Sequence, residues 1–229
     1  MSRRIGEDFA SFSSFLQRYS LVLHCSDQQI DIYKAMHKKL FGFLVFAAEF
    51  EAQKVHEDSN PFFAEMSSDL LLSLFCAVQG MYKPAKLELR CSMELLLKAI
   101  VMTNNSNIIE EKSVYTVFDI AKQDKHFLAP FAKARINTIE NDYSTLCRTV
   151  HGDPNVMSPV SALMLLPQYE EHMLRDLSKL YVRTVENYLA LFYFNYPDVV
   201  DNMHPENKKD FLDCMAKSDK CEVIVSLFG

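Results

Sequence analysis

The fold is decided by residues 84–103, which read PAKLELRCSMELLLKAIVMT. At about 100° per residue, a helix built from this stretch gathers its large apolar side chains on one side. These side chains are Leu89, Met93, Leu96, Leu97 and Ile100. Pro84 suits the first turn of a helix, because its missing N–H is not needed there. The stretch therefore predicts a long helix that packs in a protein core.

Two charged residues interrupt this helix at the edge of its apolar side. Arg90 and Glu94 are four residues apart, and we expect both to be partly buried, with Glu88, Ser92 and Ala99 facing outward. A buried charge is costly unless it is paired and hydrogen-bonded. Two interpretations stay open. The pair fixes helix register by bonding to each other or to other helices, or one or both residues line a polar pocket.

Working outward, caps and apolar periodicity predict further helices on both sides. Their expected ranges are 8–24, 27–56, 61–79, 113–121, 126–150, 168–195 and 205–216, with the longest loop at 152–166. The apolar tail, residues 222–228, is expected to pair as a strand or to pack as an apolar arm. The sequence thus predicts one all-α domain over 1–229, an antiparallel bundle of long helices. Its core spans about 27–195, and a C-terminal appendage covers about 198–229.

Composition supports the predicted helical fold and argues against some classes of function. Gly and Pro number 5 and 8 in 229 residues, so turns are few and elements long. The net charge of −6 argues against a broad surface that tracks nucleic-acid phosphates, but a local basic pocket remains compatible with it. The six cysteines form no CxxC pair, so we expect reduced thiols and no metal site. The N-terminus lacks a signal peptide, and the apolar segments 40–48 and 70–78 are far short of a membrane span, which predicts a cytoplasmic protein without membrane contact.

A second polar stretch lies at 141–153, NDYSTLCRTVHGD. Arg148 and His151 share one face at the end of a helix, with Ser144 nearest to that face and Tyr143 one turn or two earlier. Histidine exchanges a proton near neutral pH, and arginine binds phosphate with two parallel hydrogen bonds. Such a pair is suited to metal-free RNA cleavage. The alternative is a helix C-cap, in which both side chains bond the last carbonyls and neighbouring carboxylates.

These two stretches, RCSME at 90–94 and YSTLCRTVHG at 143–152, resemble HEPN-like helical families over roughly residues 60–195. The resemblance implies an antiparallel bundle, a homodimer, and a role in prokaryotic defence or toxin–antitoxin systems. Catalytic members are ribonucleases that need no metal or other cofactor. By this resemblance Arg148 and His151 are the catalytic pair. The supporting polar pocket would comprise Arg90, Glu94, Tyr143, Ser144 and Asp153.

Two hypotheses of function follow. The first is a dimeric ribonuclease in which Arg148 and His151 of each subunit act on one RNA phosphate. The second is a non-catalytic module that dimerises or binds a partner protein through its apolar tail and the aromatic helix at 168–195. The second is favoured by net acidity and by the spacing of Arg148 and His151, which is shorter than in the catalytic families.

Overall fold

The computed structural model describes residues 3–18, 26–150, 153–154 and 169–228. Ten α-helices account for most of these residues. Their bounds are α1 Arg3–Arg18, α2 Asp27–Ala52, α3 Asn60–Val78, α4 Tyr82–Val101, α5 Val114–Gln123, α6 Pro130–Val150, α7 Glu171–Asn195, α8 Pro197–Asp201, α9 Pro205–Cys214 and α10 Lys217–Phe228. The prediction of an all-α chain is confirmed.

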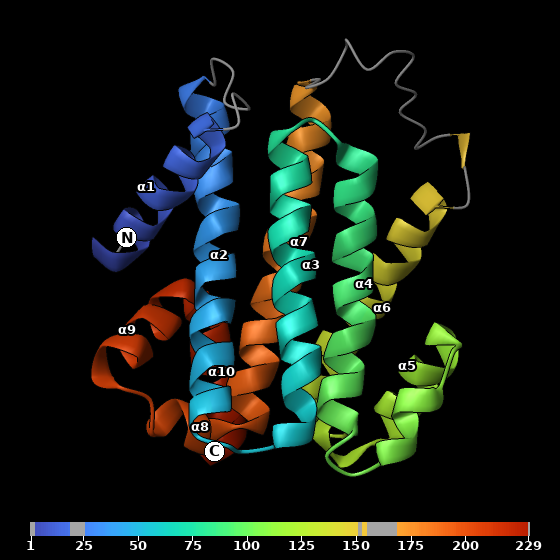
Figure 1. The fold of residues 1–229 in the computed structure, drawn as a ribbon. Helices are drawn as coiled ribbons and strands as arrows, with labels where there is room; N and C mark the ends of the chain where they lie inside the picture. The colour runs from blue at the N-terminus through green and yellow to red at the C-terminus, as the bar shows by residue number, and fades with distance from the viewer. Residues whose placement is uncertain (1–2, 19–25, 151–152, 155–168, 229) are drawn as a thin grey trace.

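Five long helices form an up-and-down bundle (Figure 1). α2, α3 and α4 lie side by side in chain order, α7 packs behind them against α2 and α4, and α6 packs against α4 and α7. Helices that follow one another along this bundle run antiparallel. The short helices surround it: α1 leans on α2, α5 covers α4 and α6, and α9 lies against the lower half of α2 (Figure 1).

Local capping signals set three helix ends where the sequence predicts them. Ser26 caps α2, because its hydroxyl accepts from the N–H of Gln29 at 3.3 Å while the Gln29 side chain accepts from the Ser26 N–H at 2.7 Å. Gly80 ends α3 with φ 66°, a left-handed conformation that glycine adopts without strain. Ser113 caps α5, because its hydroxyl accepts from the N–H of Thr116 at 3.4 Å.

Aromatic side chains fill the middle of the bundle. Phe46 of α2 stacks on Phe192 of α7, with ring centroids 4.5 Å apart and planes 7° from parallel. Phe63 of α3 lies 5.9 Å from Phe46, and Phe211 of α9 lies 5.7 Å from it. All four rings are buried. The aromatic half of α7 is therefore core, not an exposed face for a partner.

Lysine 39 joins the C-terminal part of the chain to α2. Its ammonium pairs with Glu186 of α7 at 2.7 Å and donates to the carbonyl oxygen of Cys214, at the end of α9, at 2.6 Å. The side chain is only 11% exposed, and both bonds compensate for its loss of hydration. α9 is thus anchored to the centre of the bundle.

The strand alternative for the tail was wrong. Residues 222–228 belong to helix α10, which packs against α6 and α7. Val223 is fully buried, while Arg135 of α6 bonds Asp219 at 3.0 Å and Glu222 at 2.6 Å. These tertiary contacts outweigh the β-propensity of the Val-Ile-Val run.

Two residues expected on the outer side of α4 are buried. Ser92 and Ala99 are both fully enclosed. The Ser92 hydroxyl donates to the carbonyl of Leu89 at 2.8 Å and shares a hydrogen bond with Tyr188 of α7 at 2.9 Å. α4 is covered by α3, α6 and α7, so it buries more of its circumference than one apolar stripe suggests.

Within the described ranges, the segment Glu57–Val78 is long and apolar enough to cross a membrane on length and composition alone. This segment extends well beyond residues 70–78. Core helices of bundles pass the same test, and α3 packs along α2 and α4.

Candidate functional site

Arginine 90 is the centre of the polar site between α4 and α6. It is half-buried, as expected. Its Nη2 donates to the hydroxyl of Tyr143 at 2.5 Å, and its Nε donates to Sγ of Cys147 at 3.3 Å. The guanidinium carbon lies 4.7 Å from the centroid of the Tyr143 ring, within the range of a cation–π contact. Where α4 crosses α6, the positively charged guanidinium of Arg90 therefore lies against the phenol of Tyr143.

This cation has no anionic partner among the residues that the structure describes. Glu94, one turn further along α4, pairs instead with Lys98 at 2.8 Å. Lys98 also donates to the carbonyl oxygen of Glu111 at 2.9 Å, which holds the pair away from Arg90. Arg90 thus bonds to another helix, Glu94 bonds within its own, and the two do not pair with each other.

Tyrosine 143 is almost wholly enclosed, with 2% of its surface exposed. The rings of Phe118 and Tyr115 from α5 contact it edge-on at 5.4 and 6.0 Å. Burial raises the pKa of the Tyr143 hydroxyl far above its ordinary value, although Arg90 opposes this shift. The phenol is therefore protonated at neutral pH and accepts the hydrogen bond from Arg90 as a neutral group.

The end of α6 carries a second charged group. Arg148 Nε and Nη2 both lie 2.6 Å from Oδ2 of Asp153, and the Asp153 N–H donates to the Arg148 carbonyl at 3.1 Å. This is an arginine bonded to a neighbouring carboxylate, as the C-cap interpretation expects. Its side chain is 55% exposed. Ser144 is exposed to solvent, and His151 lies outside the described residues.

The structure thus brings Arg90 together with Tyr143, and Arg148 together with Asp153. Cys147 connects the two pairs along the chain, since it contacts Arg90 and immediately precedes Arg148. Glu94 and Ser144 do not join either pair.

An ion pair that the sequence did not predict holds α6 against α7 beside this site. Arg183 donates from Nε and Nη2 to the two carboxylate oxygens of Asp142, at 2.9 and 2.5 Å. Asp142 is buried and directly precedes Tyr143. Such a two-point contact fixes the rotation of α6 and therefore the direction of the Tyr143 ring.

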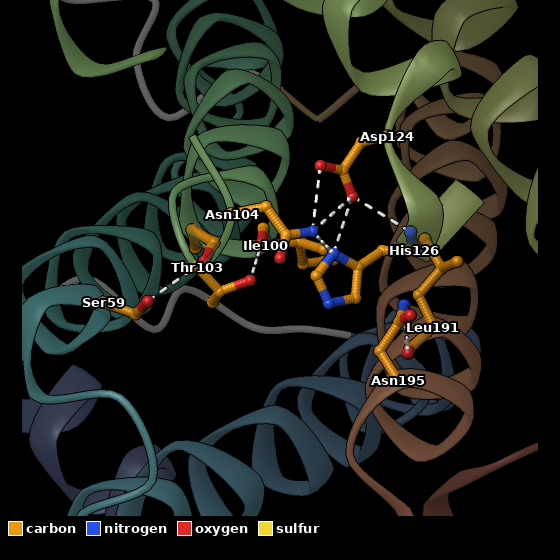
Figure 2. Close-up of polar contacts among 9 residues, drawn as sticks. Ser59, Ile100, Thr103, Asn104, Asp124, His126, Leu191 and Asn195 are labelled. Atoms are coloured by element: carbon orange, nitrogen blue, oxygen red, sulfur yellow. Dashed lines mark hydrogen bonds and ion pairs between the residues drawn. The ribbon is translucent and has the colours of Figure 1, made fainter. Parts of the chain in front are cut away.

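A second polar cluster, at the opposite end of α4, was also missed. Figure 2 shows Asn104, Asp124 and His126 meeting there. The His126 Nδ1 lies 2.7 Å from Oδ1 of Asp124, and the Asn104 side-chain nitrogen lies 3.2 Å from Oδ2 of Asp124. Burial lowers the pKa of His126, while its bond to Asp124 opposes the shift, so the ring is neutral near pH 7 with its proton directed at Asp124.

Asp124 also has a structural task in this cluster. Its Oδ1 accepts the backbone N–H of His126 at 3.0 Å, which caps the 3₁₀ helix Lys125–Phe127. The Asp-x-His spacing is the only sequence signal for the pair, and it is equally typical of a local turn. The cluster therefore joins α5 and α6 to the end of α4. The orientation of the His126 imidazole by Asp124 is a consequence of this structural contact.

In the described part of the chain, no group of three or more His, Cys, Asp or Glu side chains is arranged to hold a metal ion. No family model, curated protein or solved structure matches the chain.

Proposed function

We propose that this chain is a cytoplasmic, dimeric HEPN-like protein that binds an RNA phosphate where α4 meets α6 and cleaves the RNA without metal, in a prokaryotic defence or toxin-type system. The observation that carries the proposal is the half-buried guanidinium of Arg90, which has a phenol and a thiol as partners but no carboxylate among the described residues. A partly desolvated cation without a counter-ion attracts an anion strongly, and phosphate matches the guanidinium fork.

Arg148 would supply the second cation. Its pair with Asp153 is exposed, and exposed ion pairs contribute about 0–1 kcal/mol. A phosphate can therefore replace Asp153 at little cost, or bind beside it while Asp153 orients the guanidinium. Two arginines around one phosphate would stabilise the extra negative charge of a phosphorane.

The proposed reaction uses the RNA's own hydroxyl. The ribose 2′-oxygen attacks the adjacent phosphorus, and the bond from phosphorus to the 5′-oxygen of the next nucleotide breaks. His151 of one subunit removes the 2′-proton, and the protonated His151 of the partner subunit donates a proton to the leaving 5′-oxygen. The products are a 2′,3′-cyclic phosphate and a free 5′-hydroxyl, with no water consumed and no metal required.

The test is cleavage of a labelled single-stranded RNA by the purified chain in EDTA. We expect ends with a 2′,3′-cyclic phosphate, and no cutting of the same sequence carrying 2′-deoxyribose. His151→Ala should abolish cleavage and Arg148→Ala should reduce it by about 10²-fold or more. His172→Ala is the matched control, because His172 is 75% exposed in the first turn of α7. Cleavage unchanged in His151→Ala, or equally lost in His172→Ala, would reject the assignment.

A second candidate function is a non-catalytic helical module that assembles through α10. The observation in its favour is the exposure of two adjacent apolar residues there, Ile224 at 47% and Val225 at 68%. Sedimentation over a range of concentrations, with and without the double substitution Ile224→Gln and Val225→Gln, tests it. A complex lost in the variant, in a chain that cuts no RNA, would favour this module over the nuclease.

A further inference from the structure

A cavity of about 490 Å³ opens between α1, α2 and α3, away from the α4–α6 site. α1 leans on the upper half of α2 and forms one wall (Figure 1). α2 and α3 form the other walls. This volume lies within the range of about 300–1,000 Å³ that is usual for small-molecule sites.

Most of the cavity wall is hydrocarbon. Leu44 of α2 and the neighbouring Leu71 and Leu72 of α3 line it, and they keep 37%, 46% and 46% of their surface exposed. Phe12, Leu40 and Phe75 complete the apolar lining. An apolar ligand that covers these leucines removes their surface from water, which stabilises the complex by about 25 cal/mol per Å².

The polar corner of the cavity consists of Asp8 and Ser11 from α1 and His37 from α2. The hydrogens of these groups are already engaged: Ser11 donates to the carbonyl of Glu7 at 3.2 Å, and His37 Nε2 lies 2.8 Å from Oδ2 of Asp8. His37 is 3% exposed, and its Nδ1 has no hydrogen-bond partner. This corner therefore offers a ligand the acceptor oxygens of Asp8 and Ser11, while Nδ1 of His37 is enclosed.

The corner is also negative. Burial lowers the pKa of His37, although Asp8 opposes the shift, so the ring is neutral near pH 7 and does not cancel the Asp8 charge. The side chain of Asp8 is 49% exposed, and the described residues that line the cavity include no lysine or arginine. Among these lining residues a carboxylate ligand would find no free donor, and Asp8 would repel it.

We propose that this cavity binds an apolar amine, with its hydrocarbon part against Leu44, Leu71 and Leu72 and its ammonium group at Asp8. An ammonium group supplies donors to a corner that only accepts, and it neutralises the charge of Asp8. The site is independent of the proposed nuclease function.

Calorimetric titration of the full chain with decylamine, decan-1-ol and decanoate, each below its micellar concentration, tests the proposal. We expect saturable binding of one decylamine per chain, weaker binding of decan-1-ol, and decanoate at least about tenfold weaker than decylamine, a ratio typical of one charge-assisted hydrogen bond. Asp8→Asn should weaken decylamine by about tenfold and leave decan-1-ol unchanged, because asparagine keeps an acceptor for His37 but no charge.

Leu71→Gln tests the apolar wall, and its partial exposure lets the fold accept the change. It should weaken both decylamine and decan-1-ol, whereas Leu128→Gln, at a leucine that is 60% exposed and lies outside the cavity, should weaken neither. Decanoate binding as tightly as decylamine would overturn the proposal. So would decylamine affinity unchanged in both Asp8→Asn and Leu71→Gln. One further outcome would overturn the proposal: Leu71→Gln changes the molecular mass in solution but leaves the decylamine affinity unchanged. That result would assign this face to contact with a second copy of the chain.

Discussion

Arg90 of α4 donates to the hydroxyl of Tyr143 of α6 across 2.5 Å, and the same guanidinium lies over the ring of that tyrosine. Both ends of the contact are removed from bulk water, Tyr143 almost completely. The phenol of Tyr143 is neutral, so it does not neutralise the positive charge of Arg90. The contact therefore fixes the geometry of the α4–α6 crossing while it leaves a positive charge in place.

Tyr143→Phe removes the acceptor of this bond without changing the shape of the ring. Because Arg90 then loses a hydrogen-bond partner in a half-buried position, we expect the free energy of unfolding to fall by about 1–2 kcal/mol, measured by urea denaturation. Tyr115→Phe is the matched control, because Tyr115 is 56% exposed and contacts the same ring. Equal losses in the two variants would contradict the prediction.

The carboxyl of Asp69 on α3 gives stability a pH dependence. Asp69 is 5% exposed and one of its oxygens, Oδ2, has no hydrogen-bond partner. Burial raises its pKa to about 7, with further contributions from Glu88 and Glu65. Between about pH 4 and 7 the folded chain keeps a proton here that the unfolded chain has lost, so this group makes stability fall as pH rises through that window.

Asp69→Asn removes this titration. At pH 8 we expect the variant to be more stable than the parent by about 1–3 kcal/mol, the cost of an uncompensated buried charge. At pH 4, where the parent carboxyl is protonated, the two should agree closely. Urea titrations of both chains across this range measure the difference, and His37 and His126 contribute equally to both. Asp119→Asn, at an exposed position on α5, should change stability by the same small amount at every pH.

Helices α2 and α9 approach so closely at Gly42 that a side chain there would collide. A Cβ built on Gly42 lies 2.5 Å from Cβ of Cys214 and 3.3 Å from Leu189. Gly42→Ala should therefore lower the free energy of unfolding by about 1–3 kcal/mol, although alanine favours helix. Ala48→Gly, on the exposed side of α2, calibrates the propensity effect. A Gly42→Ala chain as stable as its parent would refute the collision.

Just past the end of α2, a lysine adopts a conformation that glycine prefers. Lys54 has φ 51°, and its N–H donates to the carbonyl of Glu51 at 3.1 Å. Lys54→Gly should raise the free energy of unfolding by about 0.5–1 kcal/mol, because glycine adopts this φ without the Cβ penalty. Thermal or urea unfolding measures it. In contrast, Lys34→Gly within α2 should lower stability by about 1 kcal/mol.

Most helix boundaries were predictable because their signals are local. The Ser26 capping box, Pro61 at the start of α3 and Gly80 at its end each act within one turn of chain. α10 was not predictable in this way. Its contacts are made to distant parts of the chain, such as the bond from Arg135 to Asp219, 84 residues further along.

The site was predictable only in part, for a related reason. Arg90 and Tyr143 stand out as polar residues within apolar helices, so their meeting followed from the bundle. The pairing of Glu94 with Lys98 was not predicted. It goes together with the bond from Lys98 to the carbonyl of Glu111, whose position is set by the tertiary fold. Asp69 lies in an apolar run with nothing local to mark it as buried.

The bond from Lys39 to the carbonyl of Cys214 joins positions 175 residues apart, and it has a consequence for biosynthesis. Helical bundles usually fold rapidly from neighbouring contacts. Here the side of α2 that α7 and α9 cover stays open until the ribosome has added the C-terminal third of the chain. At about 5–20 residues per second, that delay is roughly 10 to 35 seconds. Nascent chains stalled before α9 should therefore recruit chaperones, and release of the finished chain should end that association.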